Sequence, residues 1–276
     1  MYLAHGYELL CQWVRQPAFL AVAVLLTGCA SVGLQSRDQG AYIPVSQRTP
    51  TSEIEKGAKI HTELAGAYFA DSQIQTAQEE VTVALAYDTS YAPAHSMQGL
   101  IYMRLGDLAR ADASFAKARR LEPRDPNIAN NYGWYLCNTG RSQKGFSMVK
   151  QALDSPLYQT PVRAIVNIGD CHLHSGDLNQ ATTSYQRALV LSDNNNVLAH
   201  LGLARVDYKR GQYADSLRKS QAMLSKYGAS PGVLWQALIS ARGMQDTNTE
   251  MRFAAQLKNR FPRSIEYQWF IQGRKE

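Results

Sequence analysis

Small side chains recur at a nearly constant spacing through most of this chain of 276 residues. One series, with steps of 34, 34, 36 and 35 residues, consists of Ala77, Ala111, Gly145, Ala181 and Ser216. A second series with the same steps consists of Ala65, Gly99, Gly133, Gly169 and Ala204. A repeat of this length is typical of solenoids, in which each unit packs only against its neighbours. The sequence therefore predicts a stack of short repeated units.

Each unit reads as two helices joined by a tight turn. In the stretch YMRLGDLARADASFAKARRLEP, residues 102–123, Gly106 can take the left-handed conformation that ends a first helix, and Asp107 can cap the second. Ala111, Phe115 and Ala118 share one face of that second helix, and the proline that ends the stretch cannot continue it. The predicted fold class is therefore all-α.

A helix pair that repeats at 34 residues resembles the tetratricopeptide repeat. Residues 92–125 carry that motif most clearly, with Gly99, Tyr102, Ala111, Phe115, Ala118 and Pro123 at its characteristic positions. The resemblance implies a superhelix of about six repeats over residues 56–262, followed by a C-terminal capping helix and tail over residues 263–276. A degenerate sixth repeat, from about 231 to 262, fits a terminal capping unit.

Tetratricopeptide repeats bind a peptide segment or a protein surface in a groove lined by their first helices. By analogy, this groove is expected to contain Leu100, Met103, Arg104, Asn127, Asn130, Trp134, Cys137, Asn138, Arg163, Val166, Asp170, His174, Arg205, Tyr208 and Lys209. Trp134 is the foremost candidate, because an exposed tryptophan is a common hot spot of binding energy. The alternative for Trp134 is packing against the adjacent helix.

The N-terminus has the pattern of a secretory signal. The apolar run from Ala18 to Leu26 follows Arg15 and has nine residues, too few for a membrane span, which needs about 20. The run leads into Leu-Thr-Gly-Cys, which resembles the lipobox of bacterial lipoproteins. We therefore expect a signal peptide over residues 1–28, a lipid on Cys29, and a lipidated N-terminus with a flexible spacer over residues 29–55. Ala30 after the cysteine favours the outer membrane, with the protein facing the periplasm.

No catalytic constellation is present in the sequence. Phosphate loops, dinucleotide-binding fingerprints and zinc-protease motifs are missing. His172 and His174 point about 200° apart on a helix, so they cannot hold one metal together. The formal net charge of +6 is scattered among acidic residues. We therefore expect no enzyme activity, no metal, no cofactor, no small-molecule substrate and no nucleic-acid partner.

Cys137 and Cys171 occupy matching parts of neighbouring repeats. In an oxidising periplasm they could form a disulfide. They could also be two small hydrophobic residues in packed helices, and this second interpretation is the one we favour from the sequence.

A closer resemblance rests on three further stretches: NNYGWYLC at 130–137, PLY at 156–158, and KNRFPRSIEYQWFIQGR at 258–274. With the lipobox and the repeats, they are similar to the type IV pilus biogenesis and stability lipoproteins of the PilW/PilF family. This resemblance implies an outer-membrane pilotin that promotes the localisation and multimer assembly of the pilus secretin, its expected partner. The alternative is another envelope lipoprotein that scaffolds outer-membrane protein insertion or peptidoglycan enzymes.

Overall fold

The computed structural model describes residues 42–274, and within them every regular element is a helix. A short 3₁₀ helix, η1 (Val45–Gln47), precedes thirteen α-helices. The expected signal peptide, Cys29 and the first part of the spacer lie outside the described residues. No helix of the described part is long and apolar enough to cross a membrane.

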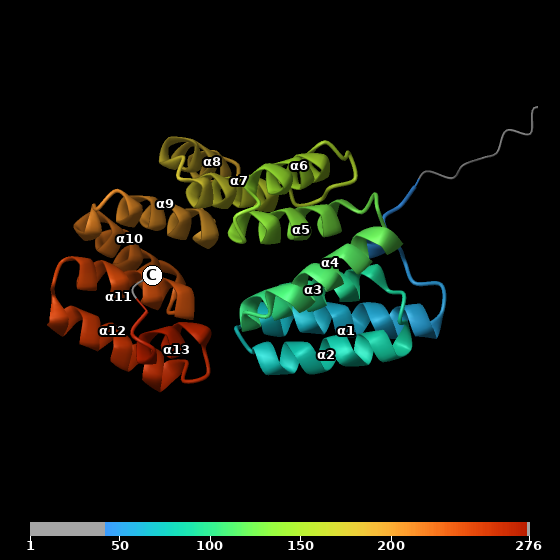
Figure 1. Ribbon diagram of the computed structural model, residues 1–276, viewed down its shortest axis with the longest axis horizontal. Helices are drawn as coiled ribbons and strands as arrows, with labels where there is room; N and C mark the ends of the chain where they lie inside the picture. The colour runs from blue at the N-terminus through green and yellow to red at the C-terminus, as the bar shows by residue number, and fades with distance from the viewer. Residues whose placement is uncertain (1–41, 275–276) are drawn as a thin grey trace, which may run out of the picture. The chain divides into compact units, whose positions relative to one another are not determined.

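Twelve of the helices form antiparallel pairs, and the pairs stack one after another (Figure 1). The pairs are α1 (Glu53–Ala70) with α2 (Ile74–Tyr87), α3 (Ala92–Leu105) with α4 (Leu108–Leu121), α5 (Pro126–Asn138) with α6 (Ser142–Leu153), α7 (Pro161–Ser175) with α8 (Leu178–Val190), α9 (Val197–Lys209) with α10 (Tyr213–Tyr227), and α11 (Pro231–Gly243) with α12 (Thr247–Arg260). The last helix is α13 (Ile265–Ile271). The expected all-α solenoid is confirmed.

The turns within the pairs follow the sequence prediction. Gly106 has a φ of 81° and ends α3, while the Asp107 carboxylate accepts a hydrogen bond from the backbone N–H of Arg110 at the start of α4. In the first and last pairs, Ser72 and Gln245 take the same left-handed region, each with a φ of 61°, where the four pairs between them have glycine. The conformation is therefore kept even where its usual residue is missing.

Small residues let the two helices of a pair approach closely. A Cβ atom added at Gly99 would lie 2.8 Å from the ring of Phe115, which is fully buried. One added at Gly133 would lie 2.9 Å from the backbone oxygen of Gly145. The second helix of each pair thus lies directly against the backbone of the first, which explains the two series of small residues.

A disulfide joins Cys137 of α5 to Cys171 of α7, with the two Cα atoms 4.8 Å apart. The interpretation favoured from the sequence, two unbonded cysteines, was therefore wrong. Both side chains are fully buried as expected, but they point at each other across the interface between neighbouring repeats. The bond links the first helices of the third and fourth repeats.

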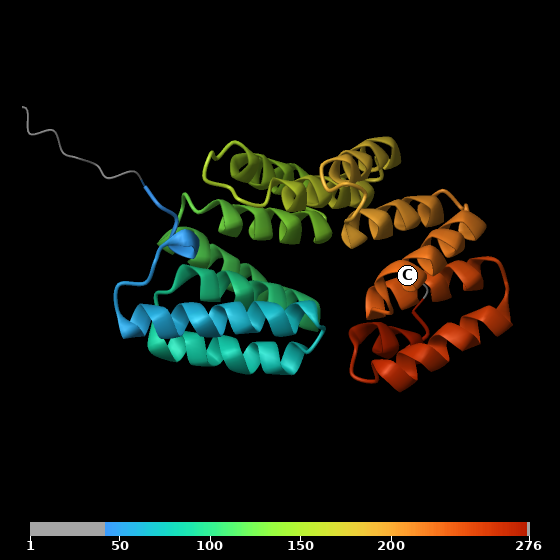
Figure 2. The same ribbon diagram turned by 180° about the vertical axis from the view of Figure 1, so that it is seen from behind.

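Part of the expected flexible spacer lies against the repeats. Ser46 donates its backbone N–H to Asp125 over 3.2 Å, and Asn127 donates its side-chain amide to Ser46 Oγ over 2.9 Å. Tyr42 donates its hydroxyl to Glu122 over 2.9 Å, and burial together with this carboxylate raises the pKa of Tyr42. The prediction of a free spacer was wrong for residues 42–52, because these contacts and the start of α1 at residue 53 fix them (Figures 1 and 2).

Within residues 42–274 the stack curves so that its C-terminal helices come back toward its second repeat. Figure 2 shows α11–α13, coloured orange to red, facing the ends of the blue-green helices. The contact is made by Arg104 of α3, whose guanidinium donates to the carboxylate of Glu266 in α13. The first helices of the repeats lie on the inner side of this curve and there they line a cavity.

Candidate binding groove

A cavity of about 550 Å³ lies on the inner side of the curve, and we call it the main cavity. Its size falls within the range of about 300–1,000 Å³ that is usual for ligand sites. It is lined by residues from α1, α3, α5, α7, α9, α11 and α13: Phe69, Leu100, Met103, Arg104, Trp134, Asn138, Leu173, His174, Arg205, Tyr208, Lys209, Trp235, Gln236, Ile239 and Trp269.

Most residues expected in the groove from the repeat register line the main cavity. They are Leu100, Met103, Arg104, Trp134, Asn138, His174, Arg205, Tyr208 and Lys209. They come from the last two turns of α3, α5, α7 and α9, which the stacking brings side by side. The structure thus gathers into one place residues that lie about 35 apart in the sequence.

Three further expected residues line a second cavity, of about 290 Å³, at the first turns of α3, α5 and α7. They are Asn127, Asn130 and Arg163. Ser46 also lines this second cavity, and its hydroxyl oxygen accepts a hydrogen bond from the side-chain amide of Asn127. Asn130 is 1% exposed and accepts a hydrogen bond from Asn167 over 2.9 Å, so its polar group serves the packing of α5 against α7.

The remaining expected residues line neither cavity. Val166 is 3% exposed and belongs to the core around Tyr185, and Cys137 is fully buried in its disulfide. Asp170 is 8% exposed and lies behind Trp134. The register argument was therefore wrong in assigning these three side chains to the groove surface.

Trp134 combines both interpretations considered from the sequence. It is half-buried and packs against the core of the first three repeats, and it lines the main cavity. Its indole N–H donates to Asp170 over 2.8 Å, and the same carboxylate accepts from Tyr185 over 2.6 Å. Burial and the negative charge of Asp170 raise the pKa of Tyr185 strongly. The buried carboxylate therefore fixes the orientation of the tryptophan ring.

The cavity wall carries four basic side chains. Arg104 pairs with Glu266, with Nη2 2.5 Å from Oε1. His174 contacts the backbone oxygen of Asp170 through Nδ1 over 2.8 Å. Lys209 lies in the last turn of α9, where a cation is favoured by the helix dipole. Arg205 lies one turn earlier on the same helix.

Aromatic rings form the opposite part of the wall. Trp235 of α11 and Trp269 of α13 meet edge to face, with ring centroids 5.6 Å apart. The sequence argument missed both, together with Phe69, Leu173, Gln236 and Ile239. Ile239 lies 34 residues after Arg205, so the repeat register could have found it. Trp269 belongs to the helix after the last repeat, where the repeat spacing makes no prediction.

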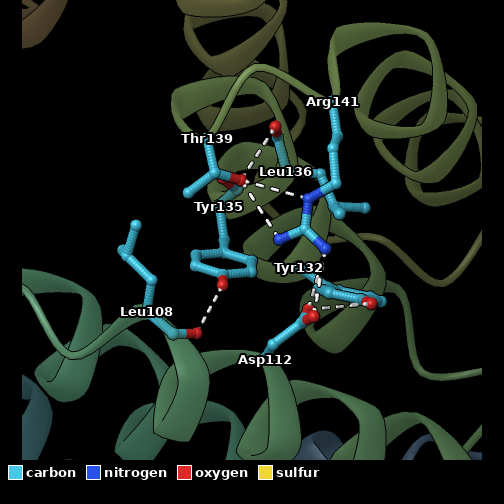
Figure 3. Close-up of polar contacts among 7 residues, drawn as sticks. All are labelled: Leu108, Asp112, Tyr132, Tyr135, Leu136, Thr139 and Arg141. Carbon is cyan, nitrogen blue, oxygen red and sulfur yellow. Dashed lines mark hydrogen bonds and ion pairs between the residues drawn. The ribbon is translucent and has the colours of Figure 1, made fainter.

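The position of α5, which carries Trp134, is fixed by a polar cluster between the second and third repeats (Figure 3). Arg141 donates to both oxygens of Asp112 over 3.1 and 3.0 Å, and Tyr135 donates its hydroxyl to the backbone oxygen of Leu108 over 2.8 Å. The Arg141 guanidinium also lies 5.1 Å from the centre of the Tyr135 ring. These contacts hold α5 against α4, and none of these residues lines the main cavity.

Among the described residues, no three His, Cys, Asp or Glu side chains gather in a way that could hold a metal ion. The lining of the main cavity is apolar, aromatic and hydrogen-bonding.

The tetratricopeptide repeat family model matches residues 92–125 and 162–195. The type IV pilus assembly protein PilF of Pseudomonas aeruginosa is 25% identical over 260 residues, which span 93% of this chain and 98% of PilF. The crystal structure of PilW, described as a widely conserved type IV pilus biogenesis factor, superimposes with a TM-score of 0.54 and 27% identity over 78% of this chain and 98% of PilW. The structure of Pseudomonas aeruginosa PilF has the same fold, with a TM-score of 0.50 and 23% identity over 81% of this chain and all of that one.

Proposed function

Because this chain is a tetratricopeptide-repeat protein of the PilW/PilF family, we propose that it acts in type IV pilus biogenesis as an outer-membrane pilotin. The observation that carries the proposal is the likeness to PilF over nearly the full length of both chains. Proteins of this type are non-enzymatic adaptors that act by binding other proteins. The main cavity, with its apolar and basic wall, supplies a surface for such a partner.

The proposed division of the chain assigns one physical task to each part. Residues 1–28 direct export, and Cys29 carries the lipid that holds the protein on the periplasmic side of the outer membrane. Residues 29–55 connect the lipid to the repeats of 56–262, and residues 263–276 cover the last repeat. Several acyl chains give stable anchoring, whereas one chain alone is marginal.

The proposed partner is the secretin of the pilus system. A protein bound to the outer membrane that also binds secretin subunits raises their effective concentration at the membrane, without any need for strong binding between the subunits themselves. Assembly of the secretin multimer is then favoured at the place where the pilus leaves the cell. The nine expected residues that line the main cavity are proposed to make the contact, with Trp134 as the main anchor.

A gene deletion tests this function, with complementation by the wild type or by Cys29→Ser. The measurements are the fraction of secretin that migrates as a multimer and the number of surface pili. We expect the deletion to leave secretin monomers and few pili, the wild type to restore both, and Cys29→Ser to restore neither fully because the protein leaves the membrane. Normal secretin multimers in the deletion strain would contradict the pilotin role. A general envelope defect with normal pili would favour the alternative scaffold for outer-membrane proteins or peptidoglycan enzymes.

A further inference from the structure

Arg205 has no partner among the described residues, unlike other basic groups of the main cavity. Its side chain is half-buried in the wall, and no hydrogen bond or ion pair joins it to any residue between 42 and 274. Arg104 is engaged by Glu266, and His174 contacts a backbone oxygen. A guanidinium has five N–H donors in a fixed fork that matches a carboxylate, so its presence on a cavity wall without an acceptor points to an anionic ligand.

The lining of the main cavity contains no aspartate or glutamate. Among the described residues, Asp170 and Glu266 are carboxylates bonded to side chains of the wall, and both are buried. Asp170 accepts from Trp134 and Tyr185, and Glu266 accepts from Arg104. The positive charge of Arg205 also lowers the pKa of Tyr185, which burial and Asp170 otherwise raise. Arg205 therefore lies near enough to Tyr185 to act on its hydroxyl through charge, and it also lines the open cavity.

The helix dipole does not account for Arg205. Cations in the last turn of a helix compensate the partial negative charge of its C-terminus, and Lys209 takes this position in α9. Arg205 lies four residues earlier, on the face of α9 that lines the cavity. A role in binding explains its position better than a role in the stability of the helix.

The remainder of the wall is apolar and aromatic. Trp134, Trp235 and Trp269 line it from three different helices, and Leu100 and Ile239 add aliphatic surface. Such walls gain free energy by burying large apolar side chains, and tryptophans contribute more than most residues to binding surfaces. The ligand chemistry that matches the whole wall is a carboxylate next to large apolar side chains.

We propose that the main cavity binds a short segment of a partner protein in which an acidic residue stands between large apolar residues, with the acidic side chain on Arg205. This inference rests on the proposed function only in taking the ligand to be a protein segment. The fixed indole of Trp134 and the pair of Trp235 and Trp269 hold the apolar side chains. Arg205 selects against segments that lack the carboxylate.

The test uses three fluorescein-labelled peptides of ten residues, with the central sequences Phe-Glu-Leu-Glu-Phe, Phe-Gln-Leu-Gln-Phe and Phe-Lys-Leu-Lys-Phe. The protein is the mature chain with Cys29→Ser, which needs no detergent. Fluorescence anisotropy gives the dissociation constant of each peptide at low salt. We expect the acidic peptide to bind about fivefold more tightly than the amide peptide, since a charge-assisted pair is about twice as strong as a neutral hydrogen bond. The lysine peptide is expected to bind most weakly.

Two substitutions of arginine to glutamine locate the effect. Arg205→Gln should bring the affinity for the acidic peptide close to that for the amide peptide. Arg218→Gln should leave all affinities unchanged, since Arg218 is exposed on α10 and pairs with Asp215. Arg205→Lys, which keeps the charge and loses the fork, should retain part of the preference and serves as the second variant if Arg205→Gln does not fold by circular dichroism.

Equal affinity for the acidic and amide peptides overturns the proposal, as does no binding up to about 1 mM, the weak limit of specific recognition. An acidic preference that persists in Arg205→Gln also overturns it. A separate experiment measures binding to vesicles of phosphatidylglycerol and phosphatidylethanolamine. If the protein binds these vesicles as tightly as the acidic peptide, and if this binding depends on Arg205, then Arg205 recognises lipid headgroups and the proposal is wrong. The assay contains no pilus component, so its failure is distinct from a failure of the pilotin role in cells.

Discussion

Arg104 and Glu266 meet across the inner side of the curved stack, with Nη2 of the arginine 2.5 Å from Oε1 of the glutamate, although 162 residues separate them in the sequence. Glu266 is 3% exposed, and its second oxygen has no partner among the described residues. The pair connects α3 to α13 directly. A charge this deeply buried depends on its one counter-ion, so the pair limits how far the two ends of the curve can separate.

Arg104→Leu should therefore destabilise the protein. Removing one partner of a buried pair costs about 3–5 kcal/mol, and we expect about 2 kcal/mol here because the Arg104 side chain is 29% exposed and partly screened. The double variant Arg104→Leu with Glu266→Leu should recover most of this loss, since it leaves no unpaired charge. Urea denaturation of the four proteins of this cycle measures both effects. A double variant as unstable as the single one would show that the pair itself stabilises the fold.

Reduction of the bond between Cys137 and Cys171 should lower the free energy of unfolding by about 2–4 kcal/mol, because the oxidised bond restricts the unfolded chain over a separation of 34 residues. Cys137→Ser with Cys171→Ser should behave like the reduced protein and should not respond to reductant. Urea denaturation with and without dithiothreitol measures the difference. Equal midpoints for the oxidised and reduced wild type would contradict the expectation.

Gly145→Ala should be strongly destabilising, although alanine is the better helix former by about 1 kcal/mol. A Cβ atom at this position would lie 2.8 Å from the backbone oxygen of Gly133, and it would overlap the sulfur of Cys137. Overpacking of this kind costs about 1–3 kcal/mol, and the bonded cysteine cannot move away. Gly232→Ala is the matched control in α11, where the nearest atom is 3.7 Å away, and its thermal midpoint should not fall.

The paired helices could be predicted because the small residues at the helix crossings recur at the repeat spacing. Gly99 is small because the ring of Phe115 lies against its backbone, and Gly133 with Val149 and Gly169 with Tyr185 repeat this relation in the next two repeats. The contacts of the segment before α1 have no such regularity. Tyr42 reaches Glu122 and Ser46 reaches Asp125 across about 80 positions, and nothing local in the sequence signals those partners.

In the candidate site, too, some residues could be predicted from the repeat register and others could not. Trp134 and Arg205 could be placed on the groove because the repeat register fixes which side of a first helix faces inward. Asp170 follows the same register, yet it turns behind the tryptophan because its carboxylate satisfies the indole and Tyr185. The pairing of Glu266 with Arg104 depends on the accumulated curvature of four repeats, which no pairwise pattern in the sequence expresses.

Asp125→Ala should cost more stability than a helix cap alone provides. Asp125 is fully buried, caps α5 through the backbone N–H groups of Asn127 and Ile128, and also accepts from Ser46. A lost cap costs about 1 kcal/mol, and we expect a total of about 2 kcal/mol because the docked segment is released as well. Asp107→Ala is the control, because that residue caps α4 and holds no distant segment. Limited proteolysis should cleave near residue 46 in the first variant and not in the second.

The stability of the fold should decrease in mild acid, in part through His95. In the neutral ring, Nε2 carries the single proton and donates it to the backbone oxygen of Thr89 over 2.9 Å. Nδ1 is buried and makes no hydrogen bond among the described residues. Burial lowers the pKa of His95, and nearby Lys117 adds to this, against smaller opposite effects of the Thr89 and Gln98 hydrogen bonds and of Asp88.

The sign of the effect follows from the second proton. Burial disfavours the charged ring in the folded protein, whereas the unfolded chain takes up this proton as the pH falls through about 6.5. The free energy of unfolding should therefore be largest above pH 7 and decline as the pH falls from 7 toward 5. His95→Gln should make this decline shallower, and His172, whose pKa burial also lowers, should account for part of what remains. Urea denaturation at pH 5, 6, 7 and 8 measures the slope, and an unchanged slope in His95→Gln would show that His95 does not contribute to it.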